Sequence, residues 1–124
     1  MLSIKINIMK RKFFVLALFA ALLGLSACSN LQPNYPEMYV VNGSDYSVEV
    51  YCDNHFVTAA SAHNNSGQTT LDNVSINLPV YVELYHYDTK GNYVRKLIWE
   101  NYYFRWDKTY KMTITNSGAT LLQL

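Results

Sequence analysis

The sequence predicts an all-β fold, a small antiparallel β-sandwich of about seven strands, for the region after residue 37. Three observations predict it. Apolar and polar residues alternate there with a period of two, which is the period of a half-buried strand. Clusters of Asn, Asp, Ser and Gly separate the alternating segments at short intervals, as turns do. No connection is long and amphipathic enough to be the crossover helix of a parallel βαβ unit.

The first predicted strands lie on either side of a strong turn signal, Asn42-Gly43-Ser44-Asp45. Met38 to Val41 precedes this turn. Tyr46 to Asp53 follows it with clean alternation, so Cys52 is expected to face the core together with the valines of the same segment. After a turn at Asp53-Asn54, His55 to Ala60 forms the next strand. The polar stretch from 61 to 70 predicts an exposed loop.

The second half of the region contains the strongest strand pattern, from Val80 to Tyr87. Leu71 to Leu78 alternates weakly, and Pro79 limits it to a sheet edge or the start of a strand. Gly91 supplies the positive φ of a predicted hairpin loop over residues 88–92. The remaining predicted strands are 93–100, with a bulge or burial on both faces at 97–99, then 109–115 and 119–124. This regular spacing favours an immunoglobulin-like or transthyretin-like sandwich over residues 38–124.

The first 27 residues differ from the rest in charge and hydropathy. They hold four basic residues and no acidic ones, whereas residues 28–124 hold six basic and nine acidic ones, so the net charge of +1 is the sum of +4 and −3. Lys10-Arg11-Lys12 precedes an apolar run, Phe13 to Ala27, that is shorter than the roughly 20 residues needed to span a bilayer. This arrangement predicts a cleaved helical signal peptide over residues 1–27, with Met9 as an alternative translation start.

Leu25-Ser26-Ala27-Cys28, at the end of the apolar run, resembles the lipobox of bacterial lipoproteins. The resemblance covers the leader and Cys28 only. It implies that signal peptidase II cleaves before Cys28, which then carries a diacylglyceryl thioether and an acylated amine, palmitate being the typical acyl chain. Two or three acyl chains anchor a protein stably, whereas one gives only marginal binding. Ser29 after this cysteine, in place of Asp, implies passage through the periplasm to the outer membrane rather than retention in the inner membrane.

Residues 28–37 comprise the lipidated cysteine and a predicted extended tether with two prolines and no hydrophobic period, Ser29 to Glu37. At about 3.1 Å per residue this tether reaches no more than roughly 28 Å, so the domain is expected close to the membrane. Once Cys28 carries lipid, Cys52 has no partner for an intrachain disulfide. Either Cys52 is a core residue, as its strand position predicts, or it pairs with another chain.

Aromatic residues are the distinctive chemical feature of residues 28–124, which contain all 11 tyrosines and both tryptophans. Three tyrosines share one face of the strand 80–87 with Glu83, opposite the predicted core face. Further aromatic residues crowd into 99–106. Such surfaces bind protein partners or stack on sugars. Alternatively, they stabilise an exposed sheet face or cap the end of a sandwich. The candidate binding residues are Tyr81, Tyr85, Tyr87, Trp99, Tyr102, Tyr103 and Trp106.

No segment has the spacing of a catalytic, metal-binding or cofactor-binding site. His55, His63 and His86 lack partners at metal-ligand spacing and are predicted to be surface or capping residues. The glycines are scattered singly, so no phosphate-binding loop is predicted, and the balanced charge gives no support for nucleic-acid binding. Cys52 faces the predicted core and has no neighbouring cation that would activate its thiol. The sequence therefore predicts no enzymatic activity, no cofactor and no metal.

Together these features predict a non-enzymatic, membrane-anchored lipoprotein that acts as a binding or assembly module, with a protein partner in the bacterial cell envelope. Two alternatives remain open. Exposed Tyr and Trp residues are also typical of a carbohydrate-binding or adhesive surface module. Tyr51-Cys52-Asp53-Asn54 resembles a fragment of the small lipoprotein inhibitors of lysozyme, which implies an inhibitor of a hydrolase. The second cysteine and the Ser-Gly-x-x-Tyr inhibitory loop of that family are absent from this sequence.

Overall fold

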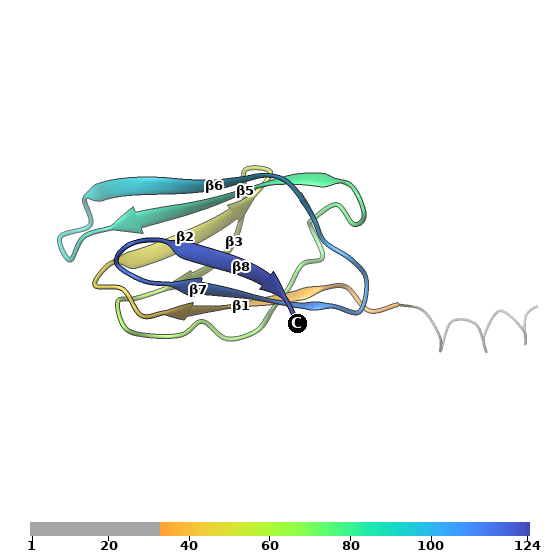
Figure 1. The fold of residues 1–124 in the computed structure, drawn as a ribbon, viewed down its shortest axis with the longest axis horizontal. Helices are drawn as coiled ribbons and strands as arrows, with labels where there is room; N and C mark the ends of the chain where they lie inside the picture. Colours follow the sequence, from red (N-terminus) through yellow and green to blue (C-terminus); the bar gives the residue numbers. More distant parts are fainter. Residues whose placement is uncertain (1–32) are drawn as a thin grey trace, which may run out of the picture. The chain divides into compact units, whose positions relative to one another are not determined.

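The computed structural model describes residues 33–124, which form a sandwich of two four-stranded sheets (Figure 1). Sheet A has the strand order β4-β1-β7-β8, and sheet B has the order β3-β2-β5-β6. The predicted all-β sandwich is confirmed, with eight strands where about seven were expected. The strands are β1 (Glu37–Asn42), β2 (Ser47–Cys52), β3 (His55–Ala60), β4 (Thr69–Thr70), β5 (Pro79–Tyr87), β6 (Tyr93–Tyr103), β7 (Thr109–Ile114) and β8 (Ala119–Gln123).

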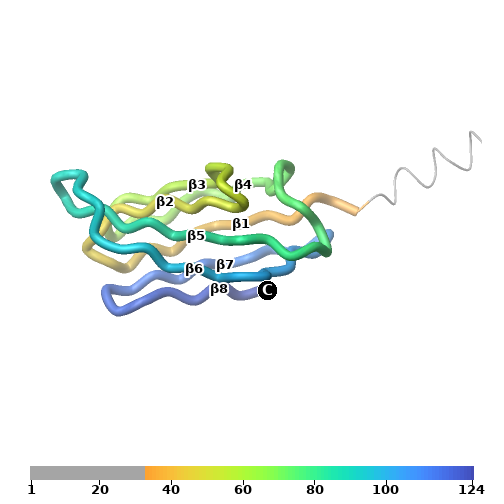
Figure 2. Tube along the Cα trace, turned by 90° about the horizontal axis from the view of Figure 1, so that it is seen from above, coloured from red at the N-terminus to blue at the C-terminus, as the bar shows by residue number. Residues whose placement is uncertain are grey.

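One strand pair differs from the predicted antiparallel pattern. Sheet B is antiparallel throughout, but in sheet A β1 pairs with β7 in parallel, from Glu37 beside Thr109 to Asn42 beside Ile114. The two strands lie side by side in Figure 2. They are far apart in the chain, which passes through β2 to β6 between them. No hairpin therefore forces them to run in opposite directions.

The core lies between the two sheets and follows the predicted alternation. In β2, β5 and β7 every second residue is buried, because successive side chains of a strand point to opposite faces. Cys52 is 1% exposed and free, so its predicted core position is confirmed. Burial raises the pKa of its thiol to about 12. The principal core side chains are Met38, Val40, Val48, Val50, Cys52, Leu71, Val80, Val82, Leu84, Phe104, Tyr110, Met112 and Ile114.

The segment 71–78, predicted to be a weak strand, is an irregular connection instead. Its first residue, Leu71, is buried and donates its backbone N–H to the carbonyl of Pro36. Asn77 has a φ of 58°, which a strand cannot accommodate, and β5 begins at Pro79. The short strand β4, by contrast, lies at the end of the stretch predicted to be a loop. Turn-forming Asp and Asn residues between 72 and 77 outweigh the weak alternation.

Strand β6 contains the predicted irregularity, but not at residues 97–99. Leu97, Ile98 and Trp99 pair regularly with β5, and Ile98 points outward with 41% of its surface exposed. The register shifts afterwards, because Val82 lies opposite Trp99 whereas Val80 lies opposite Tyr102. One extra residue on β6 makes a bulge, and Asn101 adopts a φ of 54° there. The run of three apolar residues thus reflects an exposed isoleucine between two inward side chains.

The compact unit includes residues ahead of the predicted domain boundary at residue 38. Residues 34–124 form one compact unit, and Glu37 is the first residue of β1. Asn34 and Asp107 exchange two hydrogen bonds, one from each backbone N–H. Four residues of the predicted tether are therefore fixed to the sandwich. The predicted signal peptide and Cys28 lie outside the described residues, and within residues 33–124 no helix is long and apolar enough to cross a membrane.

Candidate binding surface

The outer face of sheet B carries a continuous group of aromatic side chains, which we call the tyrosine face. It consists of Tyr51 on β2, Phe56 on β3, Tyr85 and Tyr87 on β5, and Tyr93 on β6. Strand register brings these residues together: Tyr51 lies opposite Phe56, and Tyr87 lies opposite Tyr93. Outward-pointing residues of neighbouring strands share one face, so four strands contribute to a single surface.

The rings of the tyrosine face touch one another in sequence. Ring centroids are 5.7 Å apart for Phe56 and Tyr51 and 5.3 Å apart for Tyr51 and Tyr85, with interplanar angles of 75° and 84°. Tyr93 extends the row, at 6.1 Å from Tyr85 and 6.3 Å from Tyr87. Edge-to-face and tilted pairs of this kind contribute about 0.5–1.5 kcal/mol each beyond the burial of their area. The rings therefore hold one another in fixed orientations.

Two carboxylates are built into the same face through tyrosine hydroxyls. The Tyr51 hydroxyl donates to Oε2 of Glu49 at 2.6 Å, and this bond is the main reason that the pKa of Tyr51 rises to about 12. The Tyr85 hydroxyl donates to Oε2 of Glu83, which likewise raises the pKa of Tyr85. Both phenols consequently stay protonated at neutral pH. They act as hydrogen-bond donors and do not supply a base.

Among the described residues, Lys96 is the cation that contacts this face. Its Nζ lies 3.4 Å from Oε2 of Glu83 and 5.5 Å from the ring centre of Tyr85. Partial burial works against the charge of Lys96, but Glu83 and Tyr85 outweigh it and raise the pKa of Lys96. Glu83 is only 5% exposed and is covered by these two neighbours. A carboxylate buried in this setting is held in place by its two partners.

Glu49, in contrast to Glu83, has no cationic partner among the described residues. Between residues 33 and 124 the ion pairs are His63 with Asp45 and Lys96 with Glu83, and Glu49 belongs to neither. Its only side-chain partner in this part of the chain is the Tyr51 hydroxyl. The tyrosine face therefore holds two carboxylates against one ammonium group. It is an aromatic surface with one negative charge in excess.

A shallow hollow of about 240 Å³ lies within the tyrosine face. Its walls combine ring edges and faces with a carboxylate and the side chain of Asn54 from the β2–β3 turn. Asn54 has a φ of 66°, and the turn that this conformation makes brings it to the rim of the hollow. The lining residues are Tyr51, Asn54, Glu83, Tyr85 and Tyr87.

The structure divides the candidate residues from the sequence into three sets. Tyr85 and Tyr87 belong to the tyrosine face, and Tyr81 is half-buried on the same side of β5, with its backbone N–H bonded to Asp53. Trp99 and Tyr102 pack against the core instead. Tyr103 and Trp106 are exposed near the connection from β6 to β7. Cys28 lies outside the described residues.

Tyr102 joins an aromatic cluster inside the sandwich. Its ring centroid lies 5.0 Å from that of Phe104 and 5.9 Å from that of Tyr110. Burial raises the pKa of its phenol. The crowding of aromatic residues at 99–106 thus has two origins: part of it completes the core, and part of it lies at the surface.

The candidate binding residues predicted from the sequence do not include Tyr51, Phe56, Tyr93, Glu49 or Lys96. The outward phase of Tyr51 and Glu49 is readable from the alternation of 46–53. What is not readable is that β2 lies between β3 and β5, which places these residues beside Tyr85. Strand order depends on long-range pairing, and a single sequence carries little signal for it.

The prediction that all three histidines are surface or capping residues is wrong for His86. His55 and His63 are exposed, but His86 is completely buried on the core side of β5. Its ring meets that of Tyr46 edge-on, at a centroid distance of 5.9 Å. Residue 86 is in phase with Val80, Val82 and Leu84, so the alternation itself contains the signal for burial.

The exposed histidine His63 belongs to a polar cluster of loops at the end of the sandwich away from the β2–β3 turn. Its Nε2 lies 2.6 Å from Oδ1 of Asp45, and Asn116 donates to the same carboxylate. These bonds, first that to His63 and then that to Asn116, hold the pKa of Asp45 below its usual value. In the described part of the chain, no three His, Cys, Asp or Glu side chains converge as a metal-binding group.

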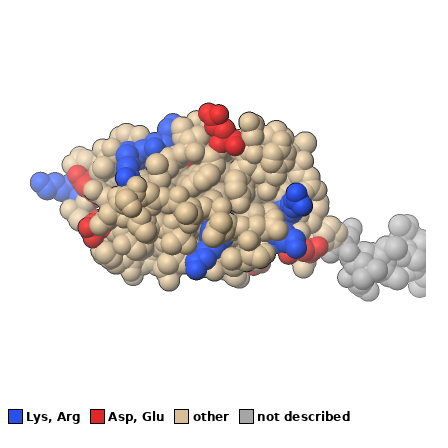
Figure 3. Space-filling model, in the orientation of Figure 1, with Lys and Arg blue, Asp and Glu red and all other residues tan. Residues whose placement is uncertain are grey.

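Most of the face visible in Figure 3 is uncharged, with single basic and acidic groups scattered over it. The aromatic and charged surfaces described above are the features of the sandwich that a partner could recognise. A scan of the chain against protein-family models gives no match, and a search of curated proteins finds no matching sequence either.

Proposed function

We propose that this protein is a lipid-anchored, non-enzymatic binding module of the bacterial cell envelope, and that its tyrosine face docks onto a protein partner. The observation that carries the proposal is the row of five touching aromatic rings on the solvent side of sheet B. The lipobox at Leu25 to Cys28 supports the anchor.

The chemistry of the tyrosine face suits protein recognition. Tyrosines that are already held by their neighbours lose little conformational entropy on binding, and Tyr is enriched among residues that dominate interface energetics. Phe56 and Tyr93 are 59% and 57% exposed and offer apolar area at either side of the row. Burying both would remove the largest exposed rings of this surface from water.

The charge of the tyrosine face indicates what the partner presents. Glu49 has no cation among the described residues, and the rings around it have electron-rich faces. A lysine or arginine side chain of the partner would meet both a carboxylate and an aromatic ring. Lys96 already has this arrangement on the neighbouring pair, Glu83 and Tyr85. We therefore expect a partner surface with an exposed basic residue flanked by apolar groups.

Site-specific photo-crosslinking in cells tests the proposal. A photoreactive amino acid at position 93, on the tyrosine face, is expected to give one discrete adduct with an envelope protein. The same amino acid at Lys111, on the outer side of sheet A, is the matched control and is expected to give none. Adduct formation from position 93 should fall at least several-fold when Glu49→Gln is added. Equal crosslinking from both positions, or none from position 93, would contradict the proposal.

A carbohydrate ligand is the second candidate, and the hollow between Tyr51 and Tyr87 favours it. The hollow combines tyrosine rings with a carboxylate and an amide. Sugars stack on such rings, and their hydroxyl groups donate hydrogen bonds to carboxylate and amide oxygens. Binding to a glycan array that is lost in Tyr85→Ala and kept in Lys111→Ala would favour this candidate over a protein partner.

A further inference from the structure

The end of the sandwich at which the described chain enters, called here the entry end, carries four exposed large hydrophobic side chains. Tyr35, Leu78, Tyr103 and Trp106 are 47%, 58%, 51% and 36% exposed, and all lie at this end. Backbone contacts connect the segments that carry them: Pro79 pairs with Tyr103, and Asn77 donates its N–H to the carbonyl of Phe104. We call these four residues the entry-end patch.

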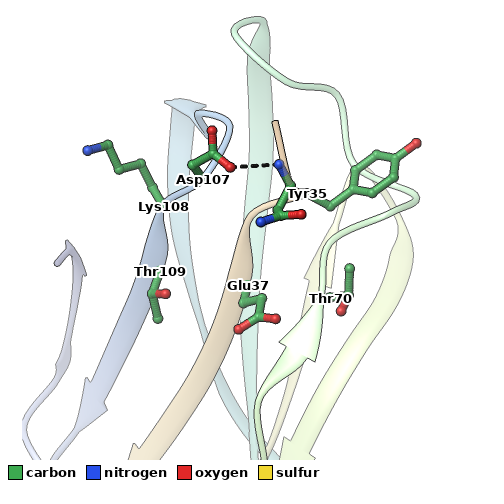
Figure 4. A pocket seen from close by; sticks show the side chains of 7 residues that line it. Tyr35, Glu37, Thr70, Asp107, Lys108 and Thr109 are labelled. Carbon is green, nitrogen blue, oxygen red and sulfur yellow. Dashed lines mark hydrogen bonds between the residues drawn. The ribbon is translucent and has the colours of Figure 1, made fainter. Parts of the chain in front are cut away.

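The first described residues are held at this end by several contacts. The Tyr35 and Trp106 rings lie 5.1 Å apart. Asp107 Oδ1 accepts the backbone N–H of Asn34 at 2.6 Å, the bond drawn as a dashed line in Figure 4. Asp107 returns its own N–H to the carbonyl of Asn34 at 2.9 Å. The position at which the chain reaches the sandwich is therefore fixed relative to the patch.

The length of chain between Cys28 and Asn34 limits how far the entry end can lie from a lipid anchor. Six residue steps span at most about 22 Å when fully extended. If Cys28 carries lipid, as the proposed function requires, its thioether lies at the membrane surface. Asn34 must then lie within that distance of the surface. No other part of the sandwich is tied as closely to the anchor.

The side chains of the entry-end patch are those that partition into the headgroup region of a bilayer. Tyr and Trp concentrate there because each has an apolar ring and a polar group that stays hydrated. Leu78 adds an aliphatic side chain. Charge at this end is mixed, since Lys108 lines the same pocket as Asp107 and Glu37. Attraction to anionic lipid is therefore not needed.

We infer that the entry end of the sandwich rests on the lipid surface, with Tyr35, Leu78, Tyr103 and Trp106 in the headgroup region. This inference rests on the proposed lipid anchor at Cys28. Sheet faces run along the strands, so a sandwich seated on this end holds its tyrosine face roughly perpendicular to the bilayer. A partner could then reach the tyrosine face from the side. The occupant of the patch is a lipid surface, and zwitterionic lipid suffices.

Tryptophan fluorescence of the lipidated protein in phosphatidylcholine vesicles tests this inference. The chain has two tryptophans, so the signal of Trp106 is the difference between the wild-type protein and Trp106→Phe. In vesicles, Trp106 is expected to be quenched by a headgroup-level lipid quencher and shielded several-fold from aqueous iodide, relative to the unlipidated Cys28→Ser protein. A Tyr93→Trp, Trp106→Phe protein provides the matched reporter at the opposite end, and its added tryptophan should stay equally accessible to iodide in both forms.

The outcomes separate two claims: contact of the entry-end patch with lipid, called here the seating, and the lipid anchor at Cys28. If the wild-type protein floats with the vesicles but Trp106 remains as accessible to iodide as in the Cys28→Ser protein, the seating is wrong and the anchor stands. If the wild-type protein does not float with the vesicles, the anchor is wrong and the seating falls with it. Shielding of Trp106 that disappears in high salt would contradict the hydrophobic contact inferred for the patch.

Discussion

Both ring nitrogens of His86 are buried without a hydrogen-bond partner among the described residues. Burial is the main cause, and the nearby charge of Arg95 on β6 the second cause, of the lowered pKa of this imidazole. Within residues 33–124, the only other titratable ring against it is that of Tyr46, ahead of β2. His86 is therefore neutral in the folded protein at neutral pH.

This neutral state predicts a loss of stability in mild acid. The pKa of His86 is lower in the folded protein than the roughly 6.5 of the unfolded chain, so the unfolded chain takes up the proton first. The contribution of His86 to the free energy of unfolding should be constant at pH values above roughly 6.5. It should fall by up to about 1.4 kcal/mol per pH unit as the pH drops from there toward the folded pKa.

Urea denaturation between pH 5 and pH 8 measures this dependence. His86→Leu is expected to reduce it, since leucine carries no proton and leaves no unpaired nitrogen. His55→Asn, an exposed position, is the control and should keep the dependence of the wild-type protein. The same pH dependence in His86→Leu as in the wild-type protein would contradict this account.

Cys52 is expected to be chemically inert in the folded protein. Its pKa of about 12 leaves almost no thiolate, and its side chain is 1% exposed. In the Cys28→Ser protein it is the only cysteine, so an aromatic disulfide reagent at pH 8 should react with no thiol until urea is added. Stoichiometric reaction of the folded protein would show that Cys52 is accessible.

At the scale of the elements, one buried asparagine joins the end of β1 to sheet B. The Nδ2 of Asn42 donates to the carbonyl of Tyr46 at 2.8 Å and to that of Ser61 at 3.0 Å, and its Oδ1 accepts from the Ser44 hydroxyl at 2.6 Å. The sequence identifies Asn42 only as the first residue of a turn. Its role in linking the β1–β2 turn to the end of β3 depends on contacts 19 residues away.

Replacing Asn42 is expected to destabilise this junction. Asn42→Ala leaves buried carbonyl groups without donors and should lower the free energy of unfolding by about 2–3 kcal/mol. Asn65→Ala, at an exposed position of the following loop, is the matched control and should change it by less than about 0.5 kcal/mol. Equal midpoints of urea denaturation for the two variants would contradict the assigned role of Asn42.

The bulge in β6 depends on a left-handed backbone at Asn101. A φ of 54° is tolerated by Asn and favoured by Gly, but it costs about 1–2 kcal/mol for a β-branched residue. Asn101→Val should lower the thermal midpoint, whereas Asn101→Gly should leave it nearly unchanged or raise it. If the two variants have the same midpoint, the bulge does not require this conformation.

The elements that the sequence predicts well are those in which alternation is strict. β2, β5 and β7 have an alternating pattern that survives in the structure, because one face of each strand packs on the core and the other meets solvent. Segment 71–78 shows the opposite case, where turn-forming residues prevail over weak alternation. β4 is too short to produce a pattern and exists because it pairs with β1.

The candidate binding surface was only partly predictable for a related reason. Tyr85 and Tyr87 could be assigned to an outer face from their own strand. Their neighbours Tyr51 and Tyr93 come from strands whose order is set by packing across the whole sandwich. Trp99 and Tyr102 read as surface candidates, but the bulge at Asn101 keeps both of them on the core side of β6.

At the scale of the whole molecule, the two ends and the two faces of the sandwich have different chemistry. The tyrosine face is aromatic and carries excess negative charge, and the entry end is aromatic with mixed charge. A short lipid tether would place the entry end against the bilayer and leave the tyrosine face accessible. A role as a binding module of the cell envelope depends on that anchor.

Metabolic labelling with palmitate is the most direct test of the anchor, using the wild-type protein and Cys28→Ser in parallel. The wild-type protein is expected to take up label, to begin at Cys28 after processing, and to sediment with membranes. Cys28→Ser is expected to take up no label and to remain unprocessed or become soluble. If Cys28→Ser is labelled and membrane-bound to the same extent as the wild-type protein, the lipid anchor at Cys28 is wrong.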